Sequence, residues 1–545
     1  MLLLAELTAP TLQPGPVRLP APPPLVAPNA KPAPEPPPLR VPASPPPEGP
    51  APAVRGFMPY RRAVLEEILA PCRSVGGEEA RLAACAEALL ARLFRDGYIS
   101  TRVLPLREPA PGVLEVVPGR IVRIDVLSPS PRLQRRVNRL VRPLQGAVLN
   151  LPRLSASLNQ LQRLPGVGRV QSSLNRVARD SGRAVLLLTV DPGTRPLRGE
   201  VSLRLDGNAG SGQFRGLATL LQPDLAIAGD TLLLSGELNS DSDPELGYRS
   251  GSLSYSLPLT DAIQLTAATG LSRRQLVEAE PPIHDLAYRQ LQLYGQFDLT
   301  LRERLGQRLY SFVALSVNRS DAFLAGRPIA VLPGGGEEAW VRNGYARFGL
   351  GVEFSQPSCS LDASLYGLQA LAALTPERQR QELAFLGMDV SRARAIGSQL
   401  SLAWSLAPRW LLELRFAGQA ALEPLPSSMG FSLGSDAGLR GLPGQVISGD
   451  SGLLGSVELS RLIWSTKRQS LQLVPFLGAG NVWTEVPGAS LRDAIGAGGV
   501  LLRWSRDSRG VLELGWVKQF QTDTRTTWDQ WILGSGVYAK MSYRF

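Results

Sequence analysis

From Arg198 onward, apolar and polar residues alternate along most of the chain. The alternation is plainest in 201–206, 252–259, 291–302, 512–517 and 537–545. Successive side chains of a strand point to opposite faces, so each stretch predicts a strand with one apolar and one polar face. A soluble sandwich would give the same alternation. Here, however, segments of about ten residues continue for about 350 residues without a helical break, which predicts a transmembrane β-barrel with a polar lumen over residues 197–545.

Several tryptophans fall near the ends of these segments. Tryptophan is enriched at both membrane–water interfaces, where its ring sits at the level of the lipid headgroups. We therefore expect aromatic girdles around the barrel. The tryptophans concerned are Trp404, Trp410, Trp464, Trp516 and Trp531.

Residues 54–196 follow a different pattern, in which helical spacing alternates with extended stretches. A first unit has helical spacing at Pro59–Leu69 and Glu78–Phe94, a capping glycine at Gly97, and extended stretches at Ser100–Leu106 and Gly112–Val117. After Gly119 come a strand at Ile121–Leu127, helices near Arg132–Leu144 and Leu151–Leu164, and strands near Gly168–Asn175 and Arg183–Val190. Two such units of about 70 residues predict two small α+β domains, 54–119 and 120–196.

Residues 1–53 hold 19 of the 47 prolines. Proline interrupts both helices and strand ladders, so this segment is expected to be an extended, disordered tether. The alternative is a proline-rich ligand for a recognition domain. The opening MLLLAELTAP lacks the basic region of a secretory signal, so we expect either an upstream start or a signal already removed.

The net charge of +11 changes this picture little, because the basic residues are mostly single arginines with no dense Lys/Arg block. We expect solvated faces or a pore lining, and no nucleic-acid partner. No apolar run approaches the roughly 18–20 residues of a membrane-spanning helix. A closed barrel is then the structure by which this chain can cross a bilayer.

Candidate catalytic chemistry is sparse. The single histidine, His284, lies in EAEPPIHDLAY, which is typical of a surface loop and not of a catalytic triad. Neither a GxxxxGK[ST] loop nor an HExxH motif occurs. Cys72 and Cys85 form either a disulfide or two half-buried thiols, and Cys359 stands alone. We expect no enzyme activity, no cofactor and no metal site.

Three motifs resemble those of the two-partner secretion transporters, the haemolysin secretion/activation (ShlB/FhaC/HecB) family of POTRA-bearing outer-membrane barrels. The first motif, RDGYISTR followed by EVVPGRI, resembles the signature of the first POTRA domain, although Pro118 replaces a frequent acid. Its residues are Gly97, Tyr98, Thr101, Arg102 and Gly119.

The second motif is similar to the Val-Arg-Gly-Phe/Tyr element of the family's sixth extracellular loop. It comprises Phe431–Gly434, Leu439–Leu442, Gly449–Gly452 and Val457–Leu459. The third motif is the terminal strand with Tyr543 and Phe545, which is similar to the signal read by barrel-assembly machinery.

The second motif implies a latch in the barrel lumen, formed by Leu439, Arg440, Gly441 and Leu442 with Glu458 as the partner of Arg440. The alternative is an ordinary Arg-Gly turn. Two departures weaken the expectation: Gly478 stands where the family often has an acid, and Leu442 replaces an aromatic residue. Residues 1–53 are too rich in proline to supply the N-terminal plug helix that relatives often carry.

The resemblance implies a 16-stranded transmembrane β-barrel in the outer membrane, preceded by two periplasmic POTRA domains. Such a protein captures one large β-helical exoprotein and exports it without ATP. Outer-membrane lipid and the barrel-assembly machinery are its other expected partners. The alternative function is a general assembly factor for outer-membrane proteins. A passive porin fits less well, because a diffusion pore needs no peptide-capture domains.

Overall fold

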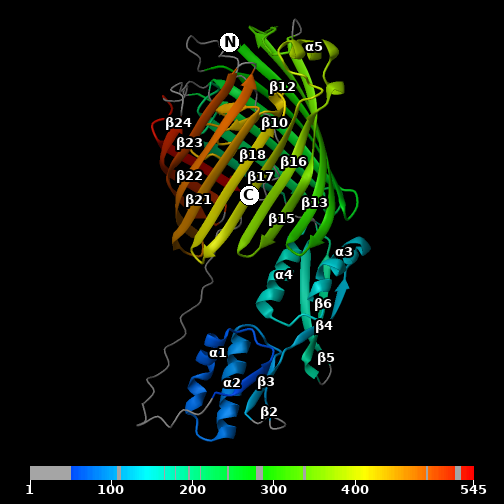
Figure 1. Ribbon diagram of the computed structural model, residues 1–545, viewed down its shortest axis with the longest axis vertical. Coiled ribbons are helices and arrows are strands. Elements are labelled where there is room, and N and C mark those ends of the chain that lie inside the picture. The colour runs from blue at the N-terminus through cyan, green and yellow to red at the C-terminus, as the bar shows by residue number, and fades with distance from the viewer. Residues whose placement is uncertain are drawn as a thin grey trace. The chain divides into compact units, whose positions relative to one another are not determined.

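The computed structural model shows an N-terminal pair of α+β domains and a C-terminal β-barrel (Figure 1). It describes residues 51–106, 112–164, 166–177, 180–193, 197–208, 210–241, 245–277, 286–335, 339–486, 489–507, 509–521 and 530–545. His284 and nearly all of the proline-rich segment lie outside these ranges. The chain divides into two compact units, with the boundary between Thr194 and Arg195. Within the described ranges, no helix has both the length and the apolar character needed to span a bilayer.

The first α+β domain has a three-stranded sheet covered by two helices. The elements are β1 (Ala53–Gly56), α1 (Arg62–Leu69), the short helix η2 (Pro71–Ser74), α2 (Glu78–Arg95), β2 (Arg102–Leu106) and β3 (Val113–Val117). The strand order is β1-β3-β2, with β1 parallel to β3. The four-residue strand β1 was absent from the sequence interpretation, because it is too short to show a period.

A disulfide joins Cys72 of η2 to Cys85 of α2, with a Cα–Cα distance of 5.2 Å. Both cysteines are buried, and the apolar face of α2, including Leu89 and Leu93, packs around them. The bridge therefore fastens the short helix onto the centre of the domain's core. It also answers the question that the sequence left open about these two residues.

The second α+β domain repeats this order of elements. They are β4 (Arg120–Leu127), α3 (Pro131–Val141), the short helix η3 (Arg142–Leu144), α4 (Leu151–Arg163), β5 (Arg169–Val177) and β6 (Asp180–Asp191). Side chains cap both helices: the Ser130 hydroxyl accepts from Leu133 N, and the Asn150 amide oxygen accepts from Arg153 N. The strand order is β4-β6-β5, with β4 parallel and β5 antiparallel to β6.

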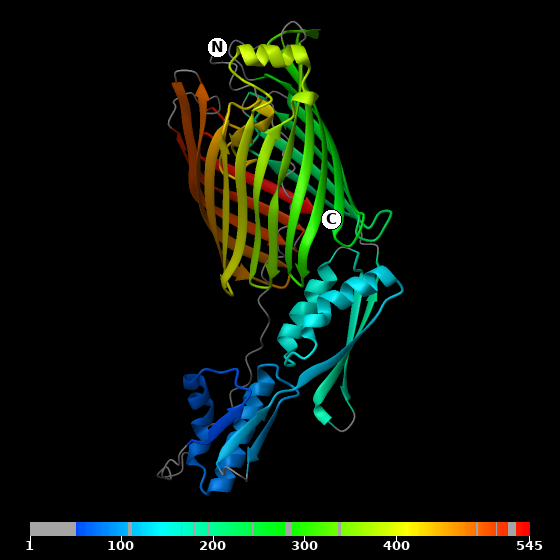
Figure 2. The same ribbon diagram turned by 45° about the vertical axis from the view of Figure 1, so that its right-hand side comes forward.

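The barrel is closed and antiparallel, and sixteen long strands form it in the described residues (Figure 2). They are β7 (Arg198–Arg204), β8 (Phe214–Pro223), β9 (Thr231–Ser240), β10 (Leu246–Pro258), β11 (Ile263–Gln275), β12 (Leu286–Arg304), β13 (Gln307–Leu324), β15 (Trp340–Gln356), β16 (Cys359–Ala370), β17 (Arg394–Ala407), β18 (Trp410–Ala421), β21 (Ser451–Ser465), β22 (Gln469–Val486), β23 (Ala489–Arg506), β24 (Gly510–Gln521) and β25 (Val537–Arg544). The two-residue strand β14 (Arg327–Pro328) pairs with the end of β13. The predicted fold class is confirmed.

Closure occurs where β25 pairs with β7, from Lys540 opposite Arg204 to Arg544 opposite Glu200. Phe545 and Gly199 extend this seam by exchanging two backbone hydrogen bonds of 3.0 Å. Because the last strand, β25, pairs with the first, β7, none of the sixteen long strands in the described residues is left as a sheet edge.

Two sequence expectations about the barrel were wrong. The region is not free of helix, since α5 (Glu377–Phe385) lies in the connection between β16 and β17 (Figure 2). Trp531 belongs to no girdle, because only 4% of it is exposed and it packs in an apolar cluster with Leu533 and Tyr538. By contrast, Trp464 and Trp516 are exposed strand residues, as a lipid-facing position requires.

Candidate functional site

The connection between β18 and β21, residues 422–450, is folded against the inner wall of the barrel. It contains a small hairpin of β19 (Phe431–Leu433) and β20 (Ile447–Gly449). Its apolar side chains Leu433, Leu439 and Leu442 are fully buried against strands β21 to β25. The side chains on the outer face of these strands are exposed, as Leu502 and Trp516 show. The side chains on the other face contact the loop and are buried. This loop therefore occupies the lumen.

Arg440 is the polar centre of the lumen loop. Its Nε donates to Glu458 Oε1 at 3.1 Å and its second terminal nitrogen to Glu458 Oε2 at 3.0 Å, which makes a bidentate pair with β21. The other terminal nitrogen donates to Glu513 Oε2 on β24 at 2.6 Å and to the Tyr538 hydroxyl on β25 at 3.2 Å. One guanidinium group thus joins three strands of the inner wall.

A second arginine completes the cluster. Arg503 of β23 donates from Nε to Glu513 Oε1 at 2.6 Å, and another of its nitrogens lies 3.7 Å from Glu458 Oε2. The exposed fractions of the two carboxylate side chains are 8% for Glu458 and 4% for Glu513. Two guanidinium groups therefore neutralise two desolvated carboxylates. Removal of one member of such a buried set typically costs about 3–5 kcal/mol, because the remaining charge is left without a partner.

Glycines make room for the loop. Gly441 has a φ of +85°, and a Cβ there would lie 2.5 Å from Val517 Cγ1. A Cβ at Gly478 would lie 3.0 Å from both Leu439 Cδ2 and Ser456 Cβ. The space that an acidic side chain would need at position 478 is thus filled by Leu439, while Glu513 supplies a second carboxylate from β24.

The loop is also tied to the first strands of the barrel. Asp436 Oδ1 accepts a 2.6 Å hydrogen bond from Arg215 of β8, and the same guanidinium donates to Glu237 of β9 at 2.8 Å. Two backbone contacts lie beside this ion pair: Gly444 N donates to Gly207 O at 2.8 Å, and Gln445 N donates to Asn208 Oδ1 at 3.1 Å. The lumen loop consequently bridges strands on both sides of the β7–β25 seam.

The POTRA-signature residues lie where the first α+β domain meets the second. Gly97, at a φ of +92°, accepts a backbone hydrogen bond of 3.0 Å from Leu151, and a Cβ on it would lie 2.4 Å from Pro152 Cδ. Gly119 O accepts from Leu149 N at 2.7 Å. Tyr98 is buried, and its ring packs edge-on against Phe57 at 5.4 Å.

The two remaining residues of the signature follow Tyr98 closely. Thr101 is buried, and Arg102 begins β2. Asp96, which precedes Gly97, accepts hydrogen bonds from the Tyr60 hydroxyl at 2.7 Å and from Arg92 Nε at 2.9 Å. Its backbone oxygen accepts from Asn150 Nδ2 at 3.0 Å. The signature therefore lies at the joint between the two α+β domains.

The terminal strand contributes to barrel closure. Tyr543 lies opposite Val201 in the β25–β7 ladder, and the Phe545 ring covers Gly199, where a Cβ would clash with it. This geometry gives both residues a place in the seam, and their recognition by assembly machinery stays a prediction.

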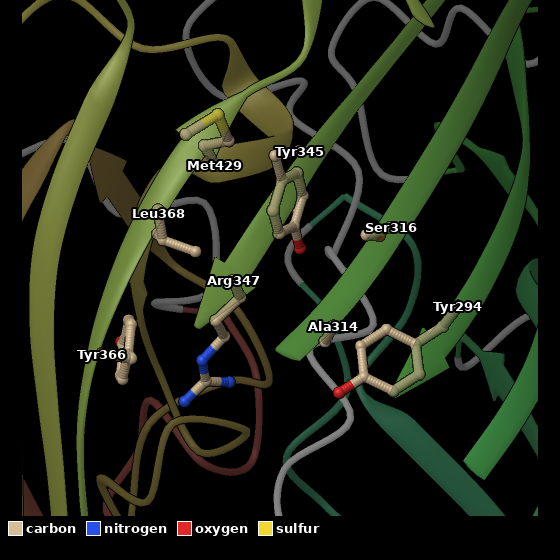
Figure 3. A pocket seen from close by; sticks show the side chains of 8 residues that line it. All are labelled: Tyr294, Ala314, Ser316, Tyr345, Arg347, Tyr366, Leu368 and Met429. Atoms are coloured by element: carbon tan, nitrogen blue, oxygen red, sulfur yellow. The ribbon is translucent and has the colours of Figure 1, made fainter. Parts of the chain in front are cut away.

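A small cavity lies on another part of the inner wall. It measures about 10 Å³, room for about one water molecule. Figure 3 shows Tyr294, Ala314, Ser316, Tyr345, Arg347, Tyr366, Leu368 and Met429 around it. The Arg347 guanidinium carbon lies 3.8 Å from the Tyr366 ring centroid, so a cation–π contact joins two of the residues that line it. Within the described residues, no group of His, Cys, Asp and Glu has metal-site geometry.

The sequence model of the haemolysin secretion/activation protein family, ShlB/FhaC/HecB, matches residues 182–501, which is more than half of the chain. The chain belongs to this family. It is accordingly an outer-membrane β-barrel protein of the two-partner secretion type, with its POTRA domains in the periplasm. No curated protein matches it in sequence.

Two solved structures of CdiB share its fold. CdiB from Escherichia coli is similar with a TM-score of 0.58 and 18% identity, over 90% of this chain and 89% of that one. CdiB from Acinetobacter baumannii is similar with a TM-score of 0.52 and 17% identity, over 90% of this chain and 88% of that one. At these identities the likeness shows the common fold and does not transfer residue roles.

Several residues of the site were not identified from the sequence. Glu513 and Arg503 occur in ordinary alternating strands, and Arg215, Glu237 and Asp436 match no motif. The sequence did hold one signal for the four residues that lie in strands. Each of them is charged and occupies a polar position in the alternation of its strand. Which of them meet depends on the stagger of the closed barrel, and the sequence does not display that stagger.

Proposed function

We propose that this chain is an outer-membrane protein translocase for one large β-helical exoprotein. In this proposal the POTRA domains capture the unfolded exoprotein in the periplasm, and the barrel passes it outward. Membership of the secretion/activation family supports the function as a class. The observation that carries it for this chain is the lumen loop, whose Arg440 joins Glu458, Glu513 and Tyr538 across the inner wall.

The lumen loop gives the proposal a mechanism. A strand or extended polypeptide cannot share the space that Leu433, Leu439 and Leu442 fill, so passage of the exoprotein requires this loop to move. The loop is held by one four-charge cluster and by the Asp436–Arg215 pair, which are discrete contacts that can be broken and remade. In the proposed cycle, Arg440 acts as a latch that returns the loop to this docked position between export events, and export of the next exoprotein starts from that position.

The proposed source of energy is the exoprotein and not a nucleotide. The sequence has no Walker-type phosphate-binding loop. Folding of a β-helical protein outside the cell buries apolar surface and forms a hydrogen-bonded ladder, which favours completion of export. The POTRA sheets offer outer strands to which an extended segment of the exoprotein can add.

Deletion of the gene in the bacterium that carries it tests the proposal. The secreted and outer-membrane proteomes of the deletion strain and its parent are compared, with the wild-type gene returned on a plasmid as the control. We expect one large repetitive protein to disappear from the medium or the cell surface while other barrels keep their abundance. A general decrease of outer-membrane proteins would instead establish an assembly factor and contradict the proposal.

A further inference from the structure

Three arginines form a row on the outer face of the barrel, across three neighbouring strands. Arg249 of β10 lies directly opposite Arg273 of β11, and Arg273 lies directly opposite Arg289 of β12. Directly opposed residues of paired strands share one face of a sheet. The same face carries the exposed apolar side chains of Leu271 in β11 and Leu253 in β10. The three arginines therefore point away from the lumen, toward the lipid.

The row lies at the extracellular end of the barrel. The chain enters β7 from the periplasmic side and the strands alternate in direction, so β10 and β12 begin, and β11 ends, at the extracellular side. Arg249 and Arg289 are each the fourth residue of their strand, and Arg273 is the third from the end of β11. An outward arginine is costly at the middle of the bilayer and nearly without cost at its interface. This position places the row at the depth of the lipid headgroups.

The charges of the row are not neutralised within the part of the chain that the structure describes. Neither β10 nor β11 contains an acidic residue. Arg273 Nε is buried and has no hydrogen-bond partner there. The guanidinium carbon of Arg289 lies 4.8 Å from the centroid of the Phe323 ring, which carries no charge. Because like charges at directly opposed positions destabilise a sheet, the row has a cost that an anion would offset.

The next two strands extend the row into a patch. Asp321 of β13 lies opposite Arg289 but accepts a 2.9 Å hydrogen bond from Arg319 on its own strand. Arg319 in turn lies directly opposite Arg342 of β15, and its guanidinium carbon is 4.8 Å from the centroid of the Trp340 ring. Five arginines and one aspartate, a net charge of +4, thus share the outer face at this end of five neighbouring strands. We call these residues the arginine patch: Arg249, Arg273, Arg289, Arg319, Arg342 and Asp321.

The arginine patch has the chemistry of a phosphate site. A guanidinium group binds phosphate oxygens through two parallel N–H bonds, and it does so more specifically than an ammonium group. Neighbouring strands lie about 4.8 Å apart, so the row of three spans only about 10 Å and its members can reach one headgroup. On the periplasmic side of the row, Leu271 and Leu253 offer an apolar surface to acyl chains. Positive charge beside an apolar surface favours an anionic lipid over a free anion.

We propose that the arginine patch binds the phosphate groups of a phosphorylated lipid in the outer leaflet of the outer membrane. Arg249, Arg273 and Arg289 supply the main contacts, because they have no carboxylate partner among the described residues. The bound phosphate offsets the repulsion within the row, so the lipid stabilises this side of the barrel wall. The site faces away from the lumen and is separate from the path proposed for the exoprotein.

The test uses the full chain in micelles of an uncharged detergent and three probes. The first probe is lipid A, an acylated disaccharide with two phosphates, the second is the same lipid with both phosphates removed, and the third is inorganic phosphate. Native mass spectrometry measures bound lipid, and heat-modifiable migration on gels gives the melting temperature of the barrel. Lipid A should bind at least about tenfold more than its dephosphorylated form. It should raise the melting temperature by at least about 3 °C, and inorganic phosphate at the same concentration by less than about 1 °C.

A charge-neutral variant locates the site. Arg249→Gln/Arg273→Gln/Arg289→Gln should lose at least about tenfold in lipid A binding, together with the rise in melting temperature. Without lipid it should melt at or above the temperature of the wild type, because the repulsion between opposed arginines is removed. A row with a merely structural role would give the opposite result, a barrel that melts lower without lipid.

The matched control removes three exposed arginines beside the periplasmic turns and should bind lipid A as the wild type does: Arg302→Gln/Arg304→Gln/Arg409→Gln. Equal loss of binding in this control would overturn the proposal, because attraction would then depend on total charge. Equal binding of lipid A and its dephosphorylated form would overturn it in the wild-type chain, without any variant. Equal stabilisation by inorganic phosphate would overturn it in favour of a free-anion site.

Discussion

Arg440 donates a 2.6 Å hydrogen bond to Glu513, seventy-three residues further along the chain, from a loop that lies inside the barrel. The same guanidinium makes a bidentate pair with Glu458, and both carboxylates are almost fully buried. A charge set of this kind is stable only while it is complete. The position of the lumen loop therefore depends on a few side chains that mutation can remove one at a time.

The substitution Arg440→Ala should leave the barrel inserted and reduce export of the exoprotein. Loss of the guanidinium leaves Glu458 and Glu513 with one arginine between them and removes about 3–5 kcal/mol of loop docking. Heat-modifiable migration of the barrel on gels measures insertion, and immunoblots of the medium measure export. Arg409→Ala, which changes an exposed arginine at the β17–β18 turn, is the matched control. Normal export by Arg440→Ala at wild-type abundance would refute the latch.

Glu458→Gln and Glu513→Gln should have non-additive effects on export. Both carboxylates accept hydrogen bonds from the guanidinium of Arg440, so loss of one carboxylate also weakens the interaction of Arg440 with the other. Residues that share a partner typically couple by about 0.5–3 kcal/mol in a double-mutant cycle. The cycle compares export by the wild type, each single variant and the double variant. Strictly additive losses would show that the two glutamates act separately.

Gly441→Ala should displace the lumen loop while every charged group of the cluster is retained. Alanine is strained at a φ of +85°, and its Cβ would lie 2.5 Å from Val517 Cγ1. We expect a higher mean conductance in planar bilayers, because the loop occludes the lumen less. Gly251→Ala in β10 is the control, since a Cβ there meets no atom within 4 Å. Unchanged conductance in Gly441→Ala would mean that the loop does not limit the pore.

The joint between the POTRA domains should weaken in acid. The hydrogen bond from Tyr60 has the largest effect on the pKa of Asp96 and holds it below its ordinary value of 3.8. Burial raises this pKa by less than the Tyr60 bond lowers it, and Arg92 lowers it further. A carboxyl group whose pKa is lowered by folding stabilises the folded state at pH values above the pKa that it has in the unfolded chain. This contribution is lost as the pH falls through the pKa that the group has in the folded chain. Pepsin cleavage within residues 51–106 should thus rise as the pH falls below about 3.8. Asp96→Asn should be cleaved above that pH as well and change less on acidification; a profile identical to the wild type would exclude this role.

Side-chain alternation and helical spacing predicted a barrel after two α+β domains, because they report which face of an element is buried. The number of strands and the pair Arg440 and Glu458 came from the family resemblance. It could not show Glu513, since that contact is set by the stagger of closed strands and not by spacing along the chain. Trp531 was misplaced for a related reason: a tryptophan near a segment end has the same local sequence whether it faces lipid or folds into a loop core.

The lumen loop has one further consequence. It holds Arg215 of β8 at one end and Tyr538 of β25 at the other, and the β7–β25 seam runs between those strands. The loop is therefore a non-covalent crosslink across the place where the barrel is joined. Widening of the seam would stretch the contacts of the crosslink. When the loop withdraws, only the short β25–β7 hydrogen-bond ladder holds the seam together. Gating of the pore and mechanical strength of the barrel wall are in this way two properties of a single element.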